Sequence, residues 1–145
     1  MTIKVKKLYE NAILPTKGSQ YAAGYDLYAY IPEGKAIIAP HSTVKIGSGV
    51  AIEPPEQTFG AVFARSGLAT KQGLRPANCV GVCDEDYRGE YIVALHNDTN
   101  EERVIENGER IAQVAFIPYC NETMTEVAEL SETVRGDGGF GSTGK

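Results

Sequence analysis

The chain has 145 residues, of which 42% are hydrophobic and 23% charged, and its formal net charge is −5. This length is that of one domain, large enough to bury roughly 68–70% of the surface that its unfolded chain exposes. The acidic balance excludes a general nucleic-acid binder, which needs a basic excess, but it permits a single nucleotide held by a few Arg side chains.

Short runs rich in β-branched and aromatic residues, with turn signals about every 8–12 residues, predict strands along most of the chain. In chain order, strands are expected at 3–8, 24–31, 36–39, 43–52, 58–64, 90–97, 102–105, 109–117 and 122–130. So many short strands are typical of an all-β sandwich or barrel. No internal repeat is visible.

Two local signals punctuate this pattern. Residues 66–73 have room for one or two helical turns, with Ser66 as the N-cap and Gly73 as the stop. Asn107 and Gly108 both tolerate positive φ and stand between two predicted strands. They therefore predict a two-residue hairpin turn that pairs those strands.

The C-terminal segment 135–144 contains five Gly and one large apolar side chain, Phe140. Such a segment buries too little surface to offset the entropy of ordering it, so alone it is expected to be disordered. Gly139 to Lys145 matches G-x-x-x-x-G-K, but a true P-loop follows a strand and opens a helix. One interpretation is a flexible tail without a function. The other is a segment that orders over a phosphorylated ring compound, using one Arg, one aromatic ring and a Ser-Thr pair.

Acidic residues are densest between 84 and 90, where Asp84, Glu85, Asp86 and Glu90 surround one Tyr and one Arg. The D-x-D spacing suits direct Mg²⁺ binding, and a single carboxylate suits a general base that orients a water. A charged hairpin turn is the alternative interpretation.

Two further polar features stand in apolar surroundings. Arg65, Ser66 and Gly67 lie where a predicted strand gives way to the helix, which suits anion binding or, equally, a solvated capping turn. Asp26 is a lone carboxylate in an aromatic strand, where it is costly unless it is paired or hydrated near a site.

The cysteines indicate a reduced protein. Cys79, Cys83 and Cys120 are an odd number, which excludes a complete disulfide framework, and neither His stands at ligand spacing from them.

The N-terminus lacks the apolar stretch of a signal peptide, and no run approaches the ~20 apolar residues of a membrane helix. We therefore expect a cytoplasmic (intracellular) protein that binds neither nucleic acid nor membrane.

Five stretches together resemble the motifs of the trimeric deoxyuridine triphosphate nucleotidohydrolase (dUTPase) family, in family order and spacing. They are "AGYDLYA" (23–29), "ARSGLA" (64–69), "NCVGVCDEDYRGE" (78–90), "GERIAQVAF" (108–116) and "RGDGGFGSTG" (135–144). Ala64 stands where the family usually has Pro, and Cys83 where an aliphatic residue is usual. Both side chains are expected to point away from the chemistry.

The resemblance implies a β jelly-roll subunit with one short helix, made of a β domain over 1–134 and a flexible Gly-rich lid over 135–145. It implies a homotrimer in which each active site borrows motifs from all three subunits. The implied reaction is hydrolysis of dUTP to dUMP and pyrophosphate, which keeps uracil out of DNA and supplies dUMP for thymidylate synthesis. Mg²⁺ would be chelated by the triphosphate, with no direct protein ligand and with Asp26 reaching one of its waters.

By the same resemblance, Asp84 is the catalytic carboxylate that activates a water for in-line attack on the α-phosphorus. Asn78 and the backbone near Gly81 and Val82 read the uracil edge, so cytosine would leave buried groups unpaired and be rejected by roughly 10⁴–10⁵. Tyr87 lies against the sugar and rejects a 2′-hydroxyl. The implied substrate-binding set is Arg65, Ser66, Gly67, Asn78, Gly81, Val82, Cys83, Tyr87, Ile92, Gln113, Arg135, Phe140, Gly141, Ser142 and Thr143.

Within that set, Arg65, Ser66, Gly67 and Gln113 resemble binders of the α- and β-phosphates. On the lid, Arg135 with Ser142 and Thr143 would hold the γ-phosphate, while Phe140 stacks on uracil. Arg110 is expected to be structural and paired with a carboxylate.

Two alternatives use the same resemblance. A deoxycytidine triphosphate deaminase shares the fold, but it needs a Glu at the base, and 78–82 contains none. A regulatory, protein-binding dUTPase usually carries an extra insert, and no insertion is obvious between these motifs.

Overall fold

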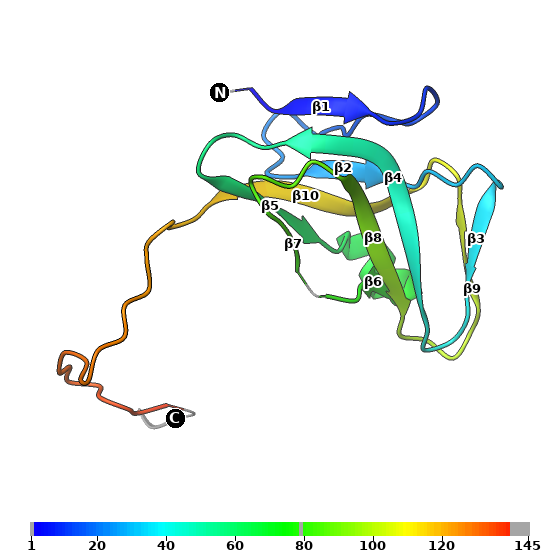
Figure 1. Ribbon diagram of the computed structural model, residues 1–145. Helices are drawn as coiled ribbons and strands as arrows, with labels where there is room; N and C mark the ends of the chain where they lie inside the picture. Colours follow the sequence, from blue (N-terminus) through cyan, green and yellow to red (C-terminus); the bar gives the residue numbers. More distant parts are fainter. Residues whose placement is uncertain (1, 79, 140–145) are drawn as a thin grey trace.

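The structure, a computed structural model, describes residues 2–78 and 80–139 (Figure 1). Within these ranges the chain forms ten strands and one short helix, in two four-stranded antiparallel sheets and one two-stranded sheet. The all-β class and the single short helix predicted from the sequence are confirmed. Among the described residues, no helix has the length and apolar character needed to cross a membrane.

The first sheet has the order β1-β4-β8-β6, and the second has the order β2-β10-β5-β7. The first sheet contains β1 (Lys4–Lys7), β4 (Thr43–Glu53), β8 (Glu90–Asn97) and β6 (Leu74–Pro76). The second contains β2 (Tyr25–Tyr28), β10 (Arg110–Pro118), β5 (Thr58–Phe63) and β7 (Gly81–Cys83). β3 (Lys35–Ile38) and β9 (Arg103–Glu106) form the two-stranded sheet, on the right in Figure 1. The helix α1 (Ser66–Gln72) follows β5 in the chain.

Alternation along β8 shows how the sequence builds the core. Tyr91, Val93, Leu95 and Asn97 are buried, and the residues between them are more exposed, as period-2 side-chain direction requires. Asn97 is the polar member of this row, and its amide group is satisfied by three backbone carbonyls and two donors from Thr99. The buried face of β8 thus fixes the strand whose first residues border the candidate site.

A bulge in β4 depends on two glycines and one carboxylate. The pairing of β4 with β8 shifts between Gly47 and Ala51, and Gly49 has a φ of 71°. The backbone N–H of Gly49 donates to Glu90 Oε1 at 2.7 Å, and a Cβ on Gly47 would collide with the same carboxylate. Glu90 therefore anchors the start of β8 in the bulge. Gly47 makes room for its carboxylate, and Gly49 supplies the left-handed backbone conformation.

The helix start lies one residue earlier than predicted. Arg65, with φ −83° and ψ 127°, is the N-cap, and its carbonyl accepts from Ala69 N at 3.0 Å. The prediction that Ser66 caps the helix is wrong, because Ser66 already belongs to the first turn. Gly73 ends the helix in the left-handed conformation with φ 65°, as predicted.

Asn107 and Gly108 form a turn, with φ 83° at Gly108, but the hairpin prediction is wrong. β9 pairs with β3, whereas β10 pairs with β2 and β5, so the two flanking strands enter different sheets. The turn bonds across to another segment: Asn107 Oδ1 accepts from Ile31 N at 2.8 Å, and Gly108 N donates to Ala29 O at 2.8 Å.

Beyond Pro118 the chain leaves the body as an extended arm over 119–139 (Figure 1). The strand predicted at 122–130 is wrong, because within residues 2–78 and 80–139 no strand lies beside this segment to pair with it. Met124 is 99% exposed and Leu130 87% exposed. The division of the chain at residue 134 stays a prediction.

Candidate functional site

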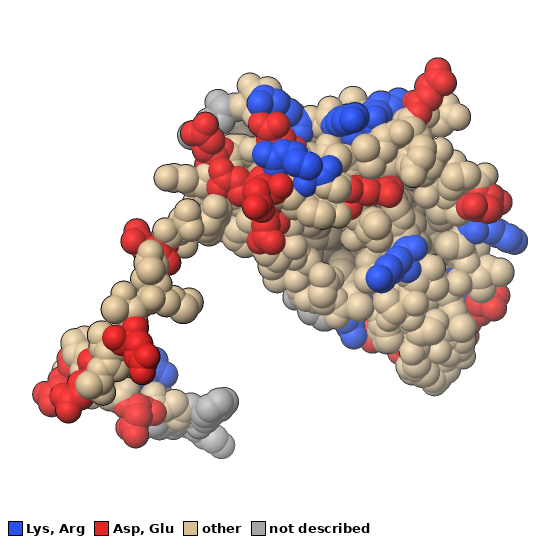
Figure 2. All heavy atoms as spheres, viewed as in Figure 1, with Lys and Arg blue, Asp and Glu red and all other residues tan. Residues whose placement is uncertain are grey.

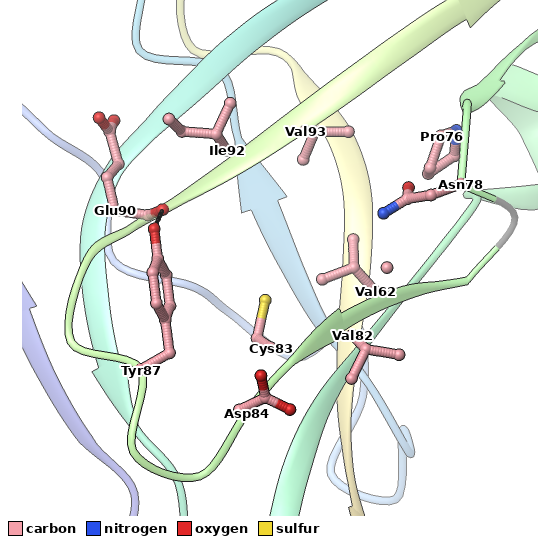
Figure 3. Close-up of a pocket in the computed structure, with 11 residues that line it drawn as sticks. Val62, Pro76, Asn78, Val82, Cys83, Asp84, Tyr87, Glu90, Ile92 and Val93 are labelled. Atoms are coloured by element: carbon pink, nitrogen blue, oxygen red, sulfur yellow. Dashed lines mark hydrogen bonds between the residues drawn. The ribbon is translucent and has the colours of Figure 1, made fainter.

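A cavity of about 220 Å³ opens between β7, β8 and the loop that joins them (Figure 3). Its walls come from four strands and two connecting segments. The lining residues are Val62, Pro76, Asn78, Gly81, Val82, Cys83, Asp84, Tyr87, Glu90, Ile92 and Val93. Seven members of the predicted catalytic and substrate-binding set are among them: Asn78, Gly81, Val82, Cys83, Asp84, Tyr87 and Ile92.

Asn78 and Tyr87 stand on opposite sides of the cavity in Figure 3, with Cys83 and Asp84 between them. A Cβ added to Gly81 would lie 3.2 Å from both Asn78 Nδ2 and Val62 Cβ. The absence of a side chain at Gly81 therefore lets the Asn78 amide lie against β7. An amide with a donor and an acceptor at one edge suits recognition of a planar, polar base.

Tyr87 is held as a wall of the cavity by its own loop. Its hydroxyl donates to the backbone carbonyl of Glu90 at 3.1 Å, the contact dashed in Figure 3. A Cβ on Gly89 would collide with the Tyr87 hydroxyl, so Gly at this position permits the arrangement. The carboxylate of Glu90 points away from the cavity to its partner in β4.

Cys83 corrects one expectation. Its side chain lines the cavity and does not point away from it, as Figure 3 shows. The reason is the short antiparallel pairing of β7 with β5, in which Cys83 lies opposite Gly60. Burial raises the pKa of the Cys83 thiol and of the Tyr91 hydroxyl beside it, so both groups are neutral at physiological pH.

A second polar cluster joins β2, β10 and the start of α1. Asp26 Oδ1 accepts from Arg65 Nε at 3.0 Å, and Asp26 Oδ2 lies 3.3 Å from Arg110 Nη1. The Asp26 side chain is only 13% exposed, so this pairing offsets the free-energy cost of burying a carboxylate in an apolar strand. The expectation that Arg110 pairs with a carboxylate is confirmed.

The same cluster carries the other residues predicted to bind phosphate. Arg65 Nη1 also donates to the Arg110 carbonyl at 3.3 Å, which leaves the outer edge of its guanidinium for a ligand. Gln113 Nε2 donates to the Ala64 carbonyl at 2.9 Å, and Ser66 and Gly67 are exposed in the first helical turn. Two cations around one carboxylate leave this cluster with a net positive charge.

The two groups of predicted residues do not meet within one chain. None of Arg65, Ser66, Gly67 and Gln113 lines the cavity that contains Asp84. Arg135 lies on the arm, where its Nε donates to the carbonyl of Gly138 at 2.9 Å. The predicted lid residues Phe140, Gly141, Ser142 and Thr143 lie outside the described residues.

Four lining residues were not predicted: Val62, Pro76, Glu90 and Val93. Val62 lies at the cavity because it pairs with Gly81, and Pro76 lies there because it belongs to β6, which pairs with β8. These are long-range strand pairings that local patterns do not reveal. For Val93, alternation along β8 indicated a core position, on the face opposite to the predicted Ile92.

Comparison with known proteins points to one family. The dUTPase family model matches residues 10–144. Among curated relatives, the deoxyuridine 5′-triphosphate nucleotidohydrolase of Hydrogenobaculum sp. is 44% identical over 144 residues, covering 99% of both chains. The enzyme of the same name from Desulfitobacterium hafniense is 49% identical over 148 residues, covering 99% of this chain and 97% of its own.

Among solved structures, the dUTPase of Staphylococcus bacteriophage 80alpha with dUPNHPP superposes with a TM-score of 0.89. It is 29% identical, and the match covers 99% of each chain. A match along nearly the whole length, by family model, curated relatives and structure together, establishes that this chain belongs to the dUTPase family.

Proposed function

We propose that this protein hydrolyses dUTP to dUMP and pyrophosphate, and that its site residues act as follows. The observation that carries the proposal is the cavity in which Asn78, Tyr87 and Asp84 come together, because it offers a base edge, a sugar wall and a carboxylate in one place. Relatives of full length bear the name of this activity.

Uracil is recognised at the Asn78 side of the cavity. The Asn78 amide and the backbone of Gly81 and Val82 pair with the uracil edge, whose donor–acceptor order is the reverse of cytosine's. A site built on such bonds rejects an analogue that leaves them unmade. Tyr87 packs against the deoxyribose, and Ile92 adds apolar surface, since both line the same cavity.

Asp84 is the general base. Its carboxylate takes a proton from a water that attacks the α-phosphorus in line, the bond from the α-phosphorus to the bridging oxygen breaks, and pyrophosphate leaves. Asp84 is exposed, so it is accessible to a water and a substrate.

The triphosphate lies at the Arg65 cluster. Arg65, with Ser66, Gly67 and Gln113, binds the α- and β-phosphates, and the net positive charge around Asp26 supports this role. Mg²⁺ bound to the triphosphate would neutralise part of its charge. Each carboxylate oxygen accepts more than one hydrogen bond, so Asp26 could also accept a hydrogen bond from a water of that Mg²⁺ while it holds both Arg side chains.

The separation of these two groups supports a shared active site. A substrate that needs both Asp84 and Arg65 requires a second chain to supply one of them, and the arm supplies Arg135 and the lid residues from a third. We therefore propose a homotrimer, an assembly of the cyclic kind that oligomers favour.

The function is tested by measuring pyrophosphate release from dUTP beside dCTP, dTTP and UTP, each with Mg²⁺. We expect rapid release from dUTP and little from the other three. Ammonia release from dCTP would favour the deaminase alternative, and no release from dUTP would overturn the proposal.

The assembly has its own prediction. Light scattering at micromolar concentration should give a mass of about three times 15.6 kDa. A fully active monomer or dimer at the same concentration would contradict the shared site.

A further inference from the structure

In the part of the chain that the structure describes, no direct bond holds the carboxylate of Asp84 in place. Among the described residues its side chain accepts no hydrogen bond, and its backbone carbonyl accepts one, from Tyr87 N at 3.1 Å. Asp84 is the first residue after the three-residue strand β7. The position of the Asp84 carboxylate therefore depends on the contacts that fix the loop 84–89.

The next residue, Glu85, ties this loop to two other segments. Glu85 Oε2 accepts from the Tyr119 hydroxyl at 2.6 Å and from the backbone N–H of Gln57 at 3.1 Å. Gln57 lies in the turn between β4 and β5 with a φ of 57°, and its carbonyl accepts from Tyr119 N at 3.2 Å. The three residues thus form a closed ring of contacts.

This ring lies beside Asp84, at the point where the arm begins. A second cavity, of about 680 Å³, is lined by Asp84 and Glu85 together with Tyr119 and Asn121. Figure 2 shows acidic side chains gathered where the arm leaves the body. Tyr119 is the first residue after β10, so it belongs at once to the root of the arm and to the support of the loop.

The bond between Tyr119 and Glu85 suits a fixed support. A hydrogen bond to an ionised acceptor is stronger than one between neutral groups. Because it donates to Glu85, the hydroxyl of Tyr119 has a raised pKa and keeps its proton throughout the neutral range. Arg88 Nη1 adds a bond to the Glu85 carbonyl at 2.6 Å, so both ends of Glu85 are engaged.

We propose that Tyr119 is a positioning residue: through Glu85 it fixes the loop that carries Asp84, and it links that loop to the root of the C-terminal arm. This inference rests on the role of Asp84 in the proposed function. Tyr119 lines the second cavity and not the one that contains Asn78 and Tyr87, so its effect falls on the chemical step and not on binding of the base.

The test is a double-mutant cycle between Tyr119→Phe and Glu85→Ala in the full chain. Each single variant should lower the single-turnover rate on dUTP by about fivefold to tenfold, with KM within about twofold of wild type. The double variant should lose no more than either single one. Glu85→Gln, which keeps an acceptor oxygen, should recover part of the loss. Tyr21→Phe is the control, because Tyr21 is 90% exposed, and it should match wild type.

Hydrogen exchange of the Tyr87 amide provides a readout that does not depend on activity. This amide bonds to the Asp84 carbonyl, and it should exchange faster in Tyr119→Phe and in Glu85→Ala than in wild type. Unchanged exchange and turnover in Tyr119→Phe, or losses that simply add in the double variant, would overturn the inference. An inactive wild-type protein would instead overturn the proposed function, and the exchange measurement would still decide the role of Tyr119.

Discussion

Asp84→Asn is expected to lower kcat for dUTP by roughly 10²–10⁴ while the Kd of a non-hydrolysable analogue changes little. Asn keeps the shape of Asp and one acceptor oxygen, but it cannot take a proton from water. No hydrogen bond to the Asp84 side chain is lost among the described residues, so the fold and the cavity should be unaffected.

The matched control for this variant is Asp86→Asn. Asp86 belongs to the same loop and carries the same charge, but it does not line the cavity with Asn78 and Tyr87. It should retain most of the wild-type kcat. Near-native turnover in Asp84→Asn, or an equal loss in Asp86→Asn, would mean that another group is the base.

Deleting residues 135–145 is expected to reduce kcat/KM by at least about a hundredfold while the protein stays folded. By the proposed function, Arg135, Ser142 and Thr143 are expected to bind the γ-phosphate and Phe140 to stack on uracil, so the deletion would remove these contacts and admit water. Among described residues, every hydrogen bond made by 133–139 lies within that segment. The thermal midpoint should therefore remain near that of the full chain.

Two measurements accompany the deletion. Phe140→Ala should show a milder loss, equivalent to a base stack of about 1–3 kcal/mol. Hydrogen exchange on 135–145 should slow only when a non-hydrolysable dUTP analogue and Mg²⁺ are added. Undiminished activity after deletion, or a segment protected without nucleotide, would show that it is no lid.

The sequence predicted strands well where burial alternates, as in β8, because the period-2 pattern is written in the residues themselves. It missed β6 and β7, which have three residues each and exist only through pairing with β8 and β5. It also joined β9 to β10 as a hairpin. Asn107 and Gly108 do specify a turn, but the partners of both strands are set by distant segments.

The candidate site was predicted from motif resemblance. The prediction agreed best with the structure for residues that are close to one another in the sequence. The residues of the 78–92 stretch come together because they belong to β7, to the segments on either side of it and to the start of β8. The positioning contacts were not predictable, since Tyr119 and Gln57 reach Glu85 from far along the chain. The roles of the lid residues beyond 139, the binding of Mg²⁺ through the triphosphate and the cytoplasmic location stay predictions.

The central claim is that one chain supplies Asp84 and the base cavity while another supplies Arg65, and mixing of variant subunits tests it most directly. Asp84→Asn and Arg65→Gln should each be nearly inactive alone. The two variants are unfolded together in equal amounts and refolded, so that they form mixed trimers. In a mixed trimer, a site is intact when the chain that supplies its carboxylate carries Asp84 and the chain that supplies its guanidinium carries Arg65. Random assembly then predicts recovery of about one quarter of the wild-type activity. A mixture that stays as inactive as its components would contradict the claim, because it would place Asp84 and Arg65 of every working site on the same chain.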